Sequence, residues 1–442
     1  MKITIVGAGK SGIAAAKLAV SLGYNVHLSE SKASSNFEKE IEVLKSLGIA
    51  YEFGGHTSHY LKNCDLVITS PGVPPHASII REAESKNIPV ISELEFAWRH
   101  LKNPVISITG TNGKTTTTAL TAFILNNSGK KAVACGNIGT PLSELVGTVS
   151  DDTILVVEAS SYQLDRCVDF RPDVGIILNI SPDHLAYHGT MENYINAKWK
   201  TSSMQNEKNL LILNQDDETI MKNLFPSGAK IQYFSYSPVS WGIYVKGGHL
   251  CFSSADKEEE LMPVGSLSLP GVHNVYNSMA AALAARAFEV SNEDIRDSLM
   301  KFLGVEHRLE LIRSLNGVDF INDSKATNVN ATWYALSSYK EPIIWIAGGR
   351  GDSNDYSLLD EFVEKNVKCI IAIGEEADNI FNHFCTIKRC YKEDSLDTAV
   401  FRAYQNSERG DKIVFTPACK SFDMFMNFEH RGEVFKNIVN SL

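Results

Sequence analysis

The sequence predicts an α/β protein of three domains. Its 442 residues are enough for three domains at about 150 residues each. Short β-branched runs alternate with helical stretches of roughly 10–20 residues, a pattern typical of parallel strands connected by helices. Two glycine-rich loops each follow one such run and precede a helical stretch. We place the domain boundaries so that the domains comprise residues 1–92, 93–304 and 305–442.

The candidate strands are short and rich in β-branched residues. They are Ile3–Val6, Leu66–Thr69, Val105–Thr109, Ile154–Val157, Val174–Asn179, Ile343–Ala347, Cys369–Ile373 and Lys412–Thr416. The stretch Lys230–Pro270 has a different pattern, with alternating aromatic residues, Gly247-Gly248 and an acidic run, Glu258–Glu260. We expect it to form a small antiparallel sheet of hairpins beside the parallel sheet of the central domain.

Composition excludes several classes of protein. Hydrophobic residues make up 44% and charged residues 21%, which is ordinary for a globular chain. The 42 Lys+Arg against 52 Asp+Glu give a net charge of −10, which argues against a nucleic-acid partner bound by bulk charge. No apolar run approaches the roughly 18 residues of a membrane span, and the first residues predict a strand rather than a signal peptide. The 8 cysteines lack a C-x-x-C pair, so we expect a cytoplasmic protein with reduced thiols.

The first glycine-rich loop is Gly7-Ala8-Gly9-Lys10-Ser11-Gly12, between Ile3–Val6 and a helical stretch. An acidic residue, Glu30, follows about 20 positions later, as in Rossmann-like domains that bind a diphosphate at a helix N-terminus. By itself this motif favours a dinucleotide and hence an NAD-dependent oxidoreductase. The motif does not distinguish NAD from another diphosphate ligand, and a tight turn that binds nothing is a further alternative.

The second loop changes this interpretation. Gly110-Thr111-Asn112-Gly113-Lys114-Thr115-Thr116-Thr117 follows Val105–Thr109 and precedes a helical stretch. It is typical of a phosphate loop (P-loop), in which backbone N–H groups cradle phosphates, Lys114 reaches the β- and γ-phosphates, and Thr115 ligates Mg²⁺. Two residues rather than the usual four separate its glycines. A diphosphate turn and a triphosphate loop in one chain indicate that ATP is spent on a nucleotide-linked substrate.

Five stretches resemble the Mur ligase family, the ATP-dependent amide ligases of peptidoglycan precursor synthesis. They are Gly110–Thr117, Cys135–Gly139, Glu158–Leu164, Asn322–Asn328 and Thr416–Asp423. Asn322–Asn328 resembles in particular the branch that adds D-glutamate to UDP-N-acetylmuramoyl-L-alanine. The resemblance implies a Rossmann-like N-terminal domain for the UDP substrate, a central P-loop ATPase domain, and a Rossmann-like C-terminal domain that binds the amino acid and closes over ATP. It implies an acyl-phosphate intermediate and a monomer.

The resemblance also implies the ATP and metal sites. The ATP site would comprise Gly110, Thr111, Asn112, Gly113, Lys114, Thr115, Thr116, Asn274, Asn277, Arg308 and Asp323. Two Mg²⁺ ions are expected, with Thr115, Glu158, His184 and Lys198 as their ligands. The catalytic residues would be Lys114, Glu158, His184 and Lys198. Lys198 would be carbamylated, which requires a neutral amine with a depressed pKa. Without the family, Lys198 would be interpreted as a helix-surface lysine, and Asn274 and Asn277 as capping residues.

Substrate contacts follow in the same way. The UDP portion would contact Gly9, Lys10, Ser11, Glu30, Ser31, Lys32, Ser70, Pro71 and Gly72. The muramoyl portion would be oriented by Asn137, Ser160 and Gln163. D-glutamate would be bound by Lys325, Thr327, Ser421, Phe422 and Phe428. Many relatives carry a lysine where this chain has Asp352, and we expect Arg350 to reach the same carboxylate by bidentate pairing.

Three alternatives remain open from the sequence. The altered loop at Asp352 is compatible with a sibling ligase that adds a different amino acid. The Gly7–Gly12 motif with Glu30 favours a nicotinamide-dependent oxidoreductase. A non-catalytic regulator would bind ATP without turning it over.

Overall fold

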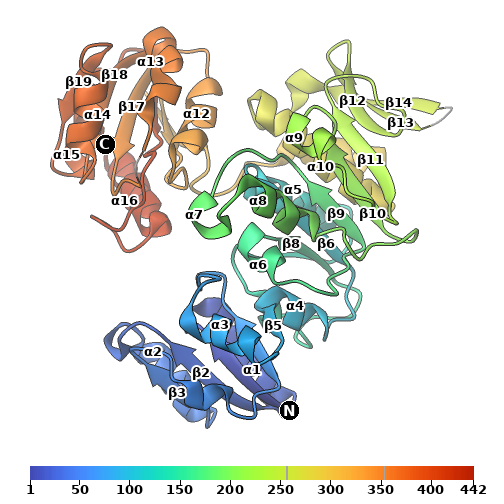
Figure 1. Ribbon diagram of the computed structural model, residues 1–442. Coiled ribbons are helices and arrows are strands. Elements are labelled where there is room, and N and C mark those ends of the chain that lie inside the picture. The colour runs from blue at the N-terminus through green and yellow to red at the C-terminus, as the bar shows by residue number, and fades with distance from the viewer. Residues whose placement is uncertain (255–256, 353) are drawn as a thin grey trace. The chain divides into compact units, whose positions relative to one another are not determined.

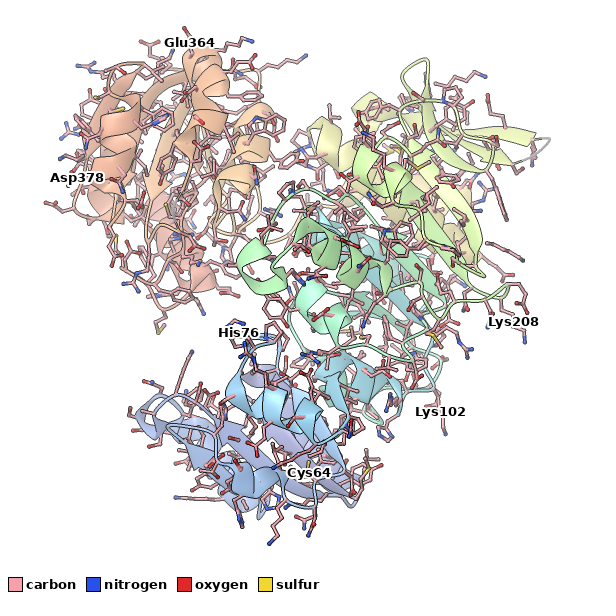
Figure 2. The ribbon with its side chains drawn as sticks, viewed as in Figure 1. Cys64, His76, Lys102, Lys208, Glu364 and Asp378 are labelled. Carbon is pink, nitrogen blue, oxygen red and sulfur yellow. The ribbon has the colours of Figure 1, made fainter. Side chains whose placement is uncertain are left out.

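The computed structural model describes residues 1–254, 257–352 and 354–442. Its strands form three sheets of five, nine and six strands in chain order (Figure 1), which confirms the α/β prediction. The chain divides into two compact units, Met1–Ser266 with Tyr276–Met300, and Leu267–Val275 with Lys301–Leu442. Charged side chains lie on the outer surfaces of helices, as Glu364 and Asp378 do in Figure 2.

The first sheet is parallel throughout, in the order β3-β2-β1-β4-β5. Its strands are β1 (Lys2–Val6), β2 (Asn25–Glu30), β3 (Ala50–Phe53), β4 (Leu66–Thr69) and β5 (Val90–Ser92). Its helices are α1 (Lys10–Ser21), α2 (Glu38–Ser46) and α3 (Ser78–Ser85). In the central strand β1, Ile3, Ile5 and Val6 are fully buried, as expected where helices cover both faces of a parallel sheet.

The turn between β1 and α1 requires glycine at two positions. Gly7 has a φ of +103°, and a Cβ on Gly12 would lie 1.9 Å from the Gly7 carbonyl oxygen. Gly9 has an ordinary φ of −70°, and no atom lies within 4 Å of the place its Cβ would take. Gly7 and Gly12 therefore close the strand–helix turn, whereas Gly9 leaves room for a ligand at the helix N-terminus.

These two glycines give a matched test of the turn. Gly12→Ala should lower the melting temperature by several degrees, because overpacking against backbone costs about 1–3 kcal/mol. Gly9→Ala is the control and should melt close to the wild type. Thermal unfolding followed by circular dichroism measures both, and equal melting temperatures would contradict this account of the turn.

The second sheet has the order β14-β13-β12-β11-β10-β9-β6-β8-β7. Its strands are β6 (Val105–Thr109), β7 (Ala132–Gly136), β8 (Ile154–Glu158), β9 (Val174–Ile177), β10 (Leu210–Asn214), β11 (Lys230–Ser235), β12 (Gly242–Lys246), β13 (His249–Ser254) and β14 (Lys257–Pro263). The helices of this region are α4 (Glu93–Trp98), α5 (Lys114–Asn127), α6 (Ser161–Asp165), α7 (Leu185–His188), α8 (Met191–Trp199), α9 (Glu218–Lys222), α10 (Val272–Ala287) and α11 (Asn292–Lys301).

The expected antiparallel insertion over Lys230–Pro270 is only partly confirmed. Strands β12, β13 and β14 form antiparallel hairpins, and the acidic run Glu258–Glu260 lies in β14. However, β11 pairs in parallel with both β10 and β12, so the hairpins extend the central sheet. The connection from β10 to β11 contains helix α9, and a helical crossover of this kind joins parallel strands.

The third sheet has the order β15-β16-β20-β17-β18-β19, with only the edge strand β15 antiparallel to its neighbour. Its strands are β15 (Glu310–Leu315), β16 (Val318–Asn322), β17 (Ile343–Gly348), β18 (Val367–Ile373), β19 (Arg389–Lys392) and β20 (Lys412–Phe415). Its helices are α12 (Val329–Ser337), α13 (Asp360–Asn366), α14 (Ala377–Phe384), α15 (Leu396–Gln405) and α16 (Phe428–Ser441). Trp345 is buried in one apolar cluster and Phe415 in another.

The strand ends position the predicted motifs. Gly110 directly follows β6, Glu158 is the last residue of β8, and Gly348 is the last residue of β17. Both predicted domain boundaries, after residues 92 and 304, lie in segments between the sheets and stay predictions. Among the described residues, no helix is long and apolar enough to cross a membrane. All eight cysteines are free thiols.

Candidate active site

The phosphate loop joins β6 to α5 and requires glycine at both ends. Gly110 has a φ of +156° and Gly113 a φ of +84°, and a Cβ on Gly113 would lie 2.4 Å from Asn277 Oδ1. Asn277 is buried and accepts a hydrogen bond from Thr117 Oγ1 at 3.2 Å. The start of helix α5 and this asparagine of α10 are therefore packed directly against each other.

Asn179, in the segment just after the neighbouring strand β9, holds the loop. The Thr111 N–H donates to the Asn179 carbonyl at 2.9 Å. The Asn112 N–H donates to Asn179 Oδ1 at 2.8 Å, and Asn179 Nδ2 donates back to the Asn112 carbonyl at 3.0 Å. Sequence reasoning assigned Asn179 no role, although a polar residue at the end of the apolar run Val174–Leu178 was a signal that could have found it.

Lys114 and Lys198 meet at one carbonyl oxygen. Lys114 Nζ donates to the carbonyls of Gly110 at 2.9 Å and Thr111 at 2.8 Å, and Lys198 Nζ donates to the Gly110 carbonyl at 2.8 Å. Lys198 is only 2% exposed, with its Nζ 4.4 Å from the centre of the Tyr194 ring. The structure thus corrects the interpretation of Lys198 as a helix-surface lysine.

The pKa of Lys198 lies well below the ordinary value for lysine. Burial is the main cause, because it disfavours the charged form, and the positive charge of Lys114 lowers the pKa further. The Asp183 carboxylate opposes both effects without cancelling them. Lys198 is therefore disposed to carry a neutral amine, the form that reacts with an electrophile such as CO₂.

Glu158 presents a buried carboxylate beside the loop. Glu158 is 2% exposed. In the sheet it lies opposite Ile108 of β6, two residues before the phosphate loop begins. Its Oε1 accepts from Asn137 Nδ2 at 2.8 Å, whereas its Oε2 is buried with no hydrogen-bond partner among the described residues. Burying a carboxylate oxygen without a partner is costly, so this donor set fits a cation. Thr115, also buried, lies in the first turn of α5.

His184 lies in the segment after β9 with a left-handed backbone, φ +55°. Its Nε2 is 3.4 Å from Asp183 Oδ2, and its ring lies 4.9 Å from that of Tyr162. His188, which sequence reasoning did not single out, is buried and stacks on Tyr162 at 5.7 Å with an interplanar angle of 13°. Apart from its spacing of four from His184, the sequence carried no signal for it.

Ser160 and Gln163 form a capping box at the start of α6. Ser160 Oγ accepts from the Gln163 N–H at 3.3 Å, and Gln163 Oε1 accepts from the Ser160 N–H at 3.0 Å. Both residues are buried. Their proposed contact with the muramoyl group therefore stays a prediction beside a structural role that the geometry shows directly.

The proposed UDP contacts gather at the ends of adjacent strands β2, β1 and β4. Glu30 accepts from the N–H groups of Ala8 and Lys32, each at 2.9 Å. Burial alone would raise the pKa of Glu30, but these hydrogen bonds and that from Ser31 hold it below its usual value. Ser70 Oγ donates to the Gly7 carbonyl at 3.3 Å. The structure thus brings together Gly9–Ser11, Glu30–Lys32 and Ser70–Gly72.

Other predicted ATP residues lie in the second compact unit. Asn274 Nδ2 donates to the Pro270 carbonyl at 2.7 Å. Asp323 is 1% exposed and accepts from Thr416 Oγ1 at 2.9 Å and from the Leu309 N–H at 3.2 Å. Burial raises the pKa of Asp323 to about 6 despite the opposing positive charge of Arg308.

The predicted role of Arg350 stays a prediction, because in the structure this residue pairs with a carboxylate of the chain itself. Its guanidinium already forms a bidentate pair with Glu375, Nε to Oε2 at 3.0 Å and Nη2 to Oε1 at 2.7 Å. The sequence could not reveal this partner, because it comes from the loop after the next strand, β18.

The other predicted amino-acid residues lie around the ends of β16 and β20. Lys325 Nζ lies 5.3 Å from the centre of the Phe428 ring, and the Thr327 N–H donates to the Lys325 carbonyl at 3.0 Å. Ser421 is buried, whereas Phe422 is 60% exposed. Thr327 and Lys325 are thus held in one tight turn.

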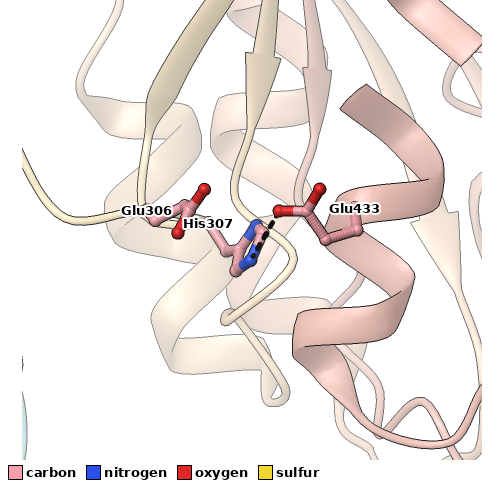
Figure 3. A group of neighbouring side chains, drawn as sticks. All are labelled: Glu306, His307 and Glu433. Carbon is pink, nitrogen blue, oxygen red and sulfur yellow. Dashed lines mark ion pairs between the residues drawn. The ribbon is translucent and has the colours of Figure 1, made fainter. Parts of the chain in front are cut away.

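Two carboxylates and a histidine form a cluster in the second compact unit (Figure 3). Glu306 and His307 lie just before β15, and Glu433 lies in α16. His307 Nε2 is 3.7 Å from Glu433 Oε1. Lys436 pairs with Glu306 and, at 3.4 Å, with Glu433. Because this ammonium already compensates the carboxylates, the cluster is a structural ion-pair network that joins α16 to the segment before β15.

Comparisons with known proteins identify the class that this fold and site define. Three family models match: the Mur ligase MurD-like N-terminal domain over residues 1–92, the Mur ligase middle domain over 108–285, and the Mur ligase glutamate ligase domain over 307–419. The chain belongs to the Mur ligase family, and the three-domain prediction is confirmed.

Individual relatives narrow the comparison. The chain is 39% identical to the UDP-N-acetylmuramoylalanine–D-glutamate ligase of Salinibacter ruber, covering 100% of this chain and 98% of that protein. It is 40% identical to the protein of the same name from Chloroherpeton thalassium, again over 100% and 98%.

Solved structures show the same fold at lower identity. A UDP-N-acetylmuramate-alanine ligase from Thermotoga maritima aligns with a TM-score of 0.61 at 20% identity, covering 100% of this chain and 99% of that chain. A MurF ligase from the same organism, solved in complex with ADP, aligns with a TM-score of 0.59 at 16% identity, covering 94% and 95%.

Proposed function

We propose that this chain joins D-glutamate to UDP-N-acetylmuramoyl-L-alanine at the expense of ATP, in peptidoglycan precursor synthesis. The observation that carries the proposal is identity of 39–40% over the whole chain to ligases of that name. The phosphate loop with Lys114 supports the use of ATP. Full-length similarity to D-glutamate ligases favours this function over a sibling ligase, an oxidoreductase or a non-catalytic regulator.

The reaction makes a carboxylate reactive toward an amine. A carboxylate oxygen of the UDP substrate attacks the γ-phosphorus of ATP, and ADP leaves. The amine nitrogen of D-glutamate then attacks the carbonyl carbon of this acyl phosphate, loses a proton, and phosphate leaves. Lys114 acts in the first step, because its ammonium stabilises the negative charge on the oxygens of the transferred phosphoryl group.

The residues beside the loop fit divalent cations. Glu158 and Thr115 would hold one Mg²⁺, and the observation that supports this is Glu158 Oε2, which has no hydrogen-bond partner in the part of the chain that the structure describes. His184 and a carbamylated Lys198 would hold a second Mg²⁺. When bound, Mg²⁺ neutralises charge on phosphate oxygens. Carbamylation converts the buried amine of Lys198 into an anion, which would be attracted to the ammonium of Lys114.

Asn137 tests the first of these sites. Its Nδ2 donates to Glu158 Oε1 at 2.8 Å, so Asn137→Ala should weaken the apparent Mg²⁺ affinity by about 10- to 100-fold, the usual effect of losing a hydrogen bond to a metal ligand. The measurement is phosphate release as a function of Mg²⁺ concentration. Asn127→Ala, at the end of α5, is the control. An unchanged Mg²⁺ dependence in Asn137→Ala would remove Glu158 from the metal site.

Phosphate release from ATP tests the proposed function. The purified chain should release phosphate only when UDP-N-acetylmuramoyl-L-alanine and D-glutamate are both present, and omission of either should stop it. A panel of D- and L-amino acids separates the sibling ligases, because D-glutamate should have the highest kcat/KM. Absence of phosphate release with both substrates, or a change in NADH fluorescence on adding the protein, would overturn the proposal.

A further inference from the structure

One buried guanidinium joins two loops of the second compact unit. Arg431 of helix α16 is 1% exposed. Its Nη1 donates to the Cys419 carbonyl at 3.0 Å and its Nη2 donates to the Ser324 carbonyl at 2.7 Å. Its Nε donates to Ser324 Oγ at 3.0 Å. The loop after β16 and the loop after β20 are therefore held within the width of a single arginine side chain.

Each of these loops continues directly into a lysine. Lys325 follows Ser324, and Lys420 follows Cys419. Because both preceding carbonyls are bound to Arg431, the two lysines begin from closely spaced points of the backbone. A substrate with two carboxylates can pair with two cations, and these loops supply two.

Lys420 also lies beside the loop after β17, from which the sequence predicted that Arg350 would bind the amino-acid substrate. The Arg350 N–H donates to the Lys420 carbonyl at 2.8 Å, and the Lys420 N–H donates to the Arg350 carbonyl at 2.9 Å. The guanidinium of Arg350 is committed to two hydrogen bonds with Glu375. Lys420 Nζ instead pairs with a single carboxylate, Asp352 Oδ2, at 2.7 Å.

The Lys420–Asp352 pair can be exchanged for another carboxylate. The side chain of Asp352 is 72% exposed and that of Lys420 is 44% exposed. Ion pairs at such exposure contribute little to stability, so a carboxylate positioned by a binding site competes with Asp352 successfully. The high exposure of Asp352 lets its side chain turn into solvent, away from the negative charge of an incoming substrate.

We propose that Lys420 binds one of the two carboxylates of the amino-acid substrate, and that this carboxylate displaces Asp352, which pairs with the Lys420 ammonium before the substrate binds. This inference rests on the proposed function and names a residue that determines amino-acid recognition. The cation that binds this carboxylate is then Lys420, on the loop after β20. The loop after β17, where many relatives carry a lysine, has Asp352 in this chain. Lys325 is then the partner of the other carboxylate.

Lys420→Gln is the decisive variant. It should raise the KM for D-glutamate at least tenfold, leave kcat within about threefold, and leave the KM values for ATP and the UDP substrate unchanged. Lys365→Gln is the matched control, since Lys365 also pairs with one exposed carboxylate, Glu361, and should behave as the wild type. A wild-type KM for D-glutamate in Lys420→Gln would overturn the inference.

The Lys365→Gln control distinguishes failure of the Lys420 inference from failure of the proposed function. If wild type and Lys365→Gln release phosphate with D-glutamate, the function stands, whatever Lys420→Gln does. Asp352→Asn should lower the KM for D-glutamate, because it removes the competing carboxylate. The same change made in the Lys420→Gln background should have no such effect, since no ammonium remains to compete for. Equal effects of Asp352→Asn in both backgrounds would contradict the exchange.

Discussion

Lys114→Ala is expected to reduce turnover by about a hundred- to a thousandfold or more, the usual loss when a preorganised group that stabilises transition-state charge is removed. The ammonium of Lys114 is aimed at the phosphate loop, as its hydrogen bonds to the Gly110 and Thr111 carbonyls show. These bonds are short-range and local, so the fold should survive their loss. The measurement is kcat for phosphate release, together with the circular dichroism melt.

Lys131→Ala is the control for this variant. Lys131 lies beyond the far end of α5 and pairs with the exposed Asp152, so its removal should leave kcat unchanged. A near-normal kcat in Lys114→Ala, with both proteins folded, would exclude the phosphate loop from the mechanism.

Lys198→Ala is expected to lose activity to a similar degree, and part of it should return when a short carboxylic acid such as acetate or propionate is added. The depressed pKa of Lys198 favours a neutral amine and hence carbamylation. The alanine variant leaves space beside Gly110 that a small carboxylate can enter to supply the missing oxygen ligands. The measurement is phosphate release as a function of added acid.

Recovery of Lys198→Ala activity by an added carboxylic acid distinguishes a carbamylated Lys198 from a lysine with only a structural role. Lys222→Ala removes an exposed helix lysine paired with Glu218 and should neither lose activity nor respond to acid. Full activity of Lys198→Ala, or loss that no carboxylic acid restores, would contradict a ligand role for Lys198.

The sequence was sufficient where chemistry depends on neighbours along the chain. The turn at Gly7–Gly12 and the loop at Gly110–Thr117 were predicted because their glycines, cation and hydroxyls lie within a few residues of one another. The strand ends that carry Glu158 and Gly348 were predicted because parallel strands are short apolar runs.

The remainder depends on contacts between distant residues. The hydrogen bond of Lys198 to Gly110 and the effect of the Lys114 charge on its pKa both involve residues more than 80 positions earlier. The partners of Arg350 and Lys420, Glu375 and Asp352 respectively, come from loops after other strands. The parallel direction of β11 depends on its pairing with β10 and β12. No local pattern specifies these pairings.

The central claim is that ATP activates a carboxylate by phosphoryl transfer, and an isotope measurement tests it most directly. UDP-N-acetylmuramoyl-L-alanine labelled with ¹⁸O in its carboxylate is incubated with ATP, D-glutamate and the enzyme, and the phosphate is analysed by mass spectrometry. Because the attacking carboxylate oxygen stays on phosphorus when the amine displaces phosphate, each phosphate should carry one ¹⁸O. Phosphate released together with the amide product but free of ¹⁸O would contradict the account.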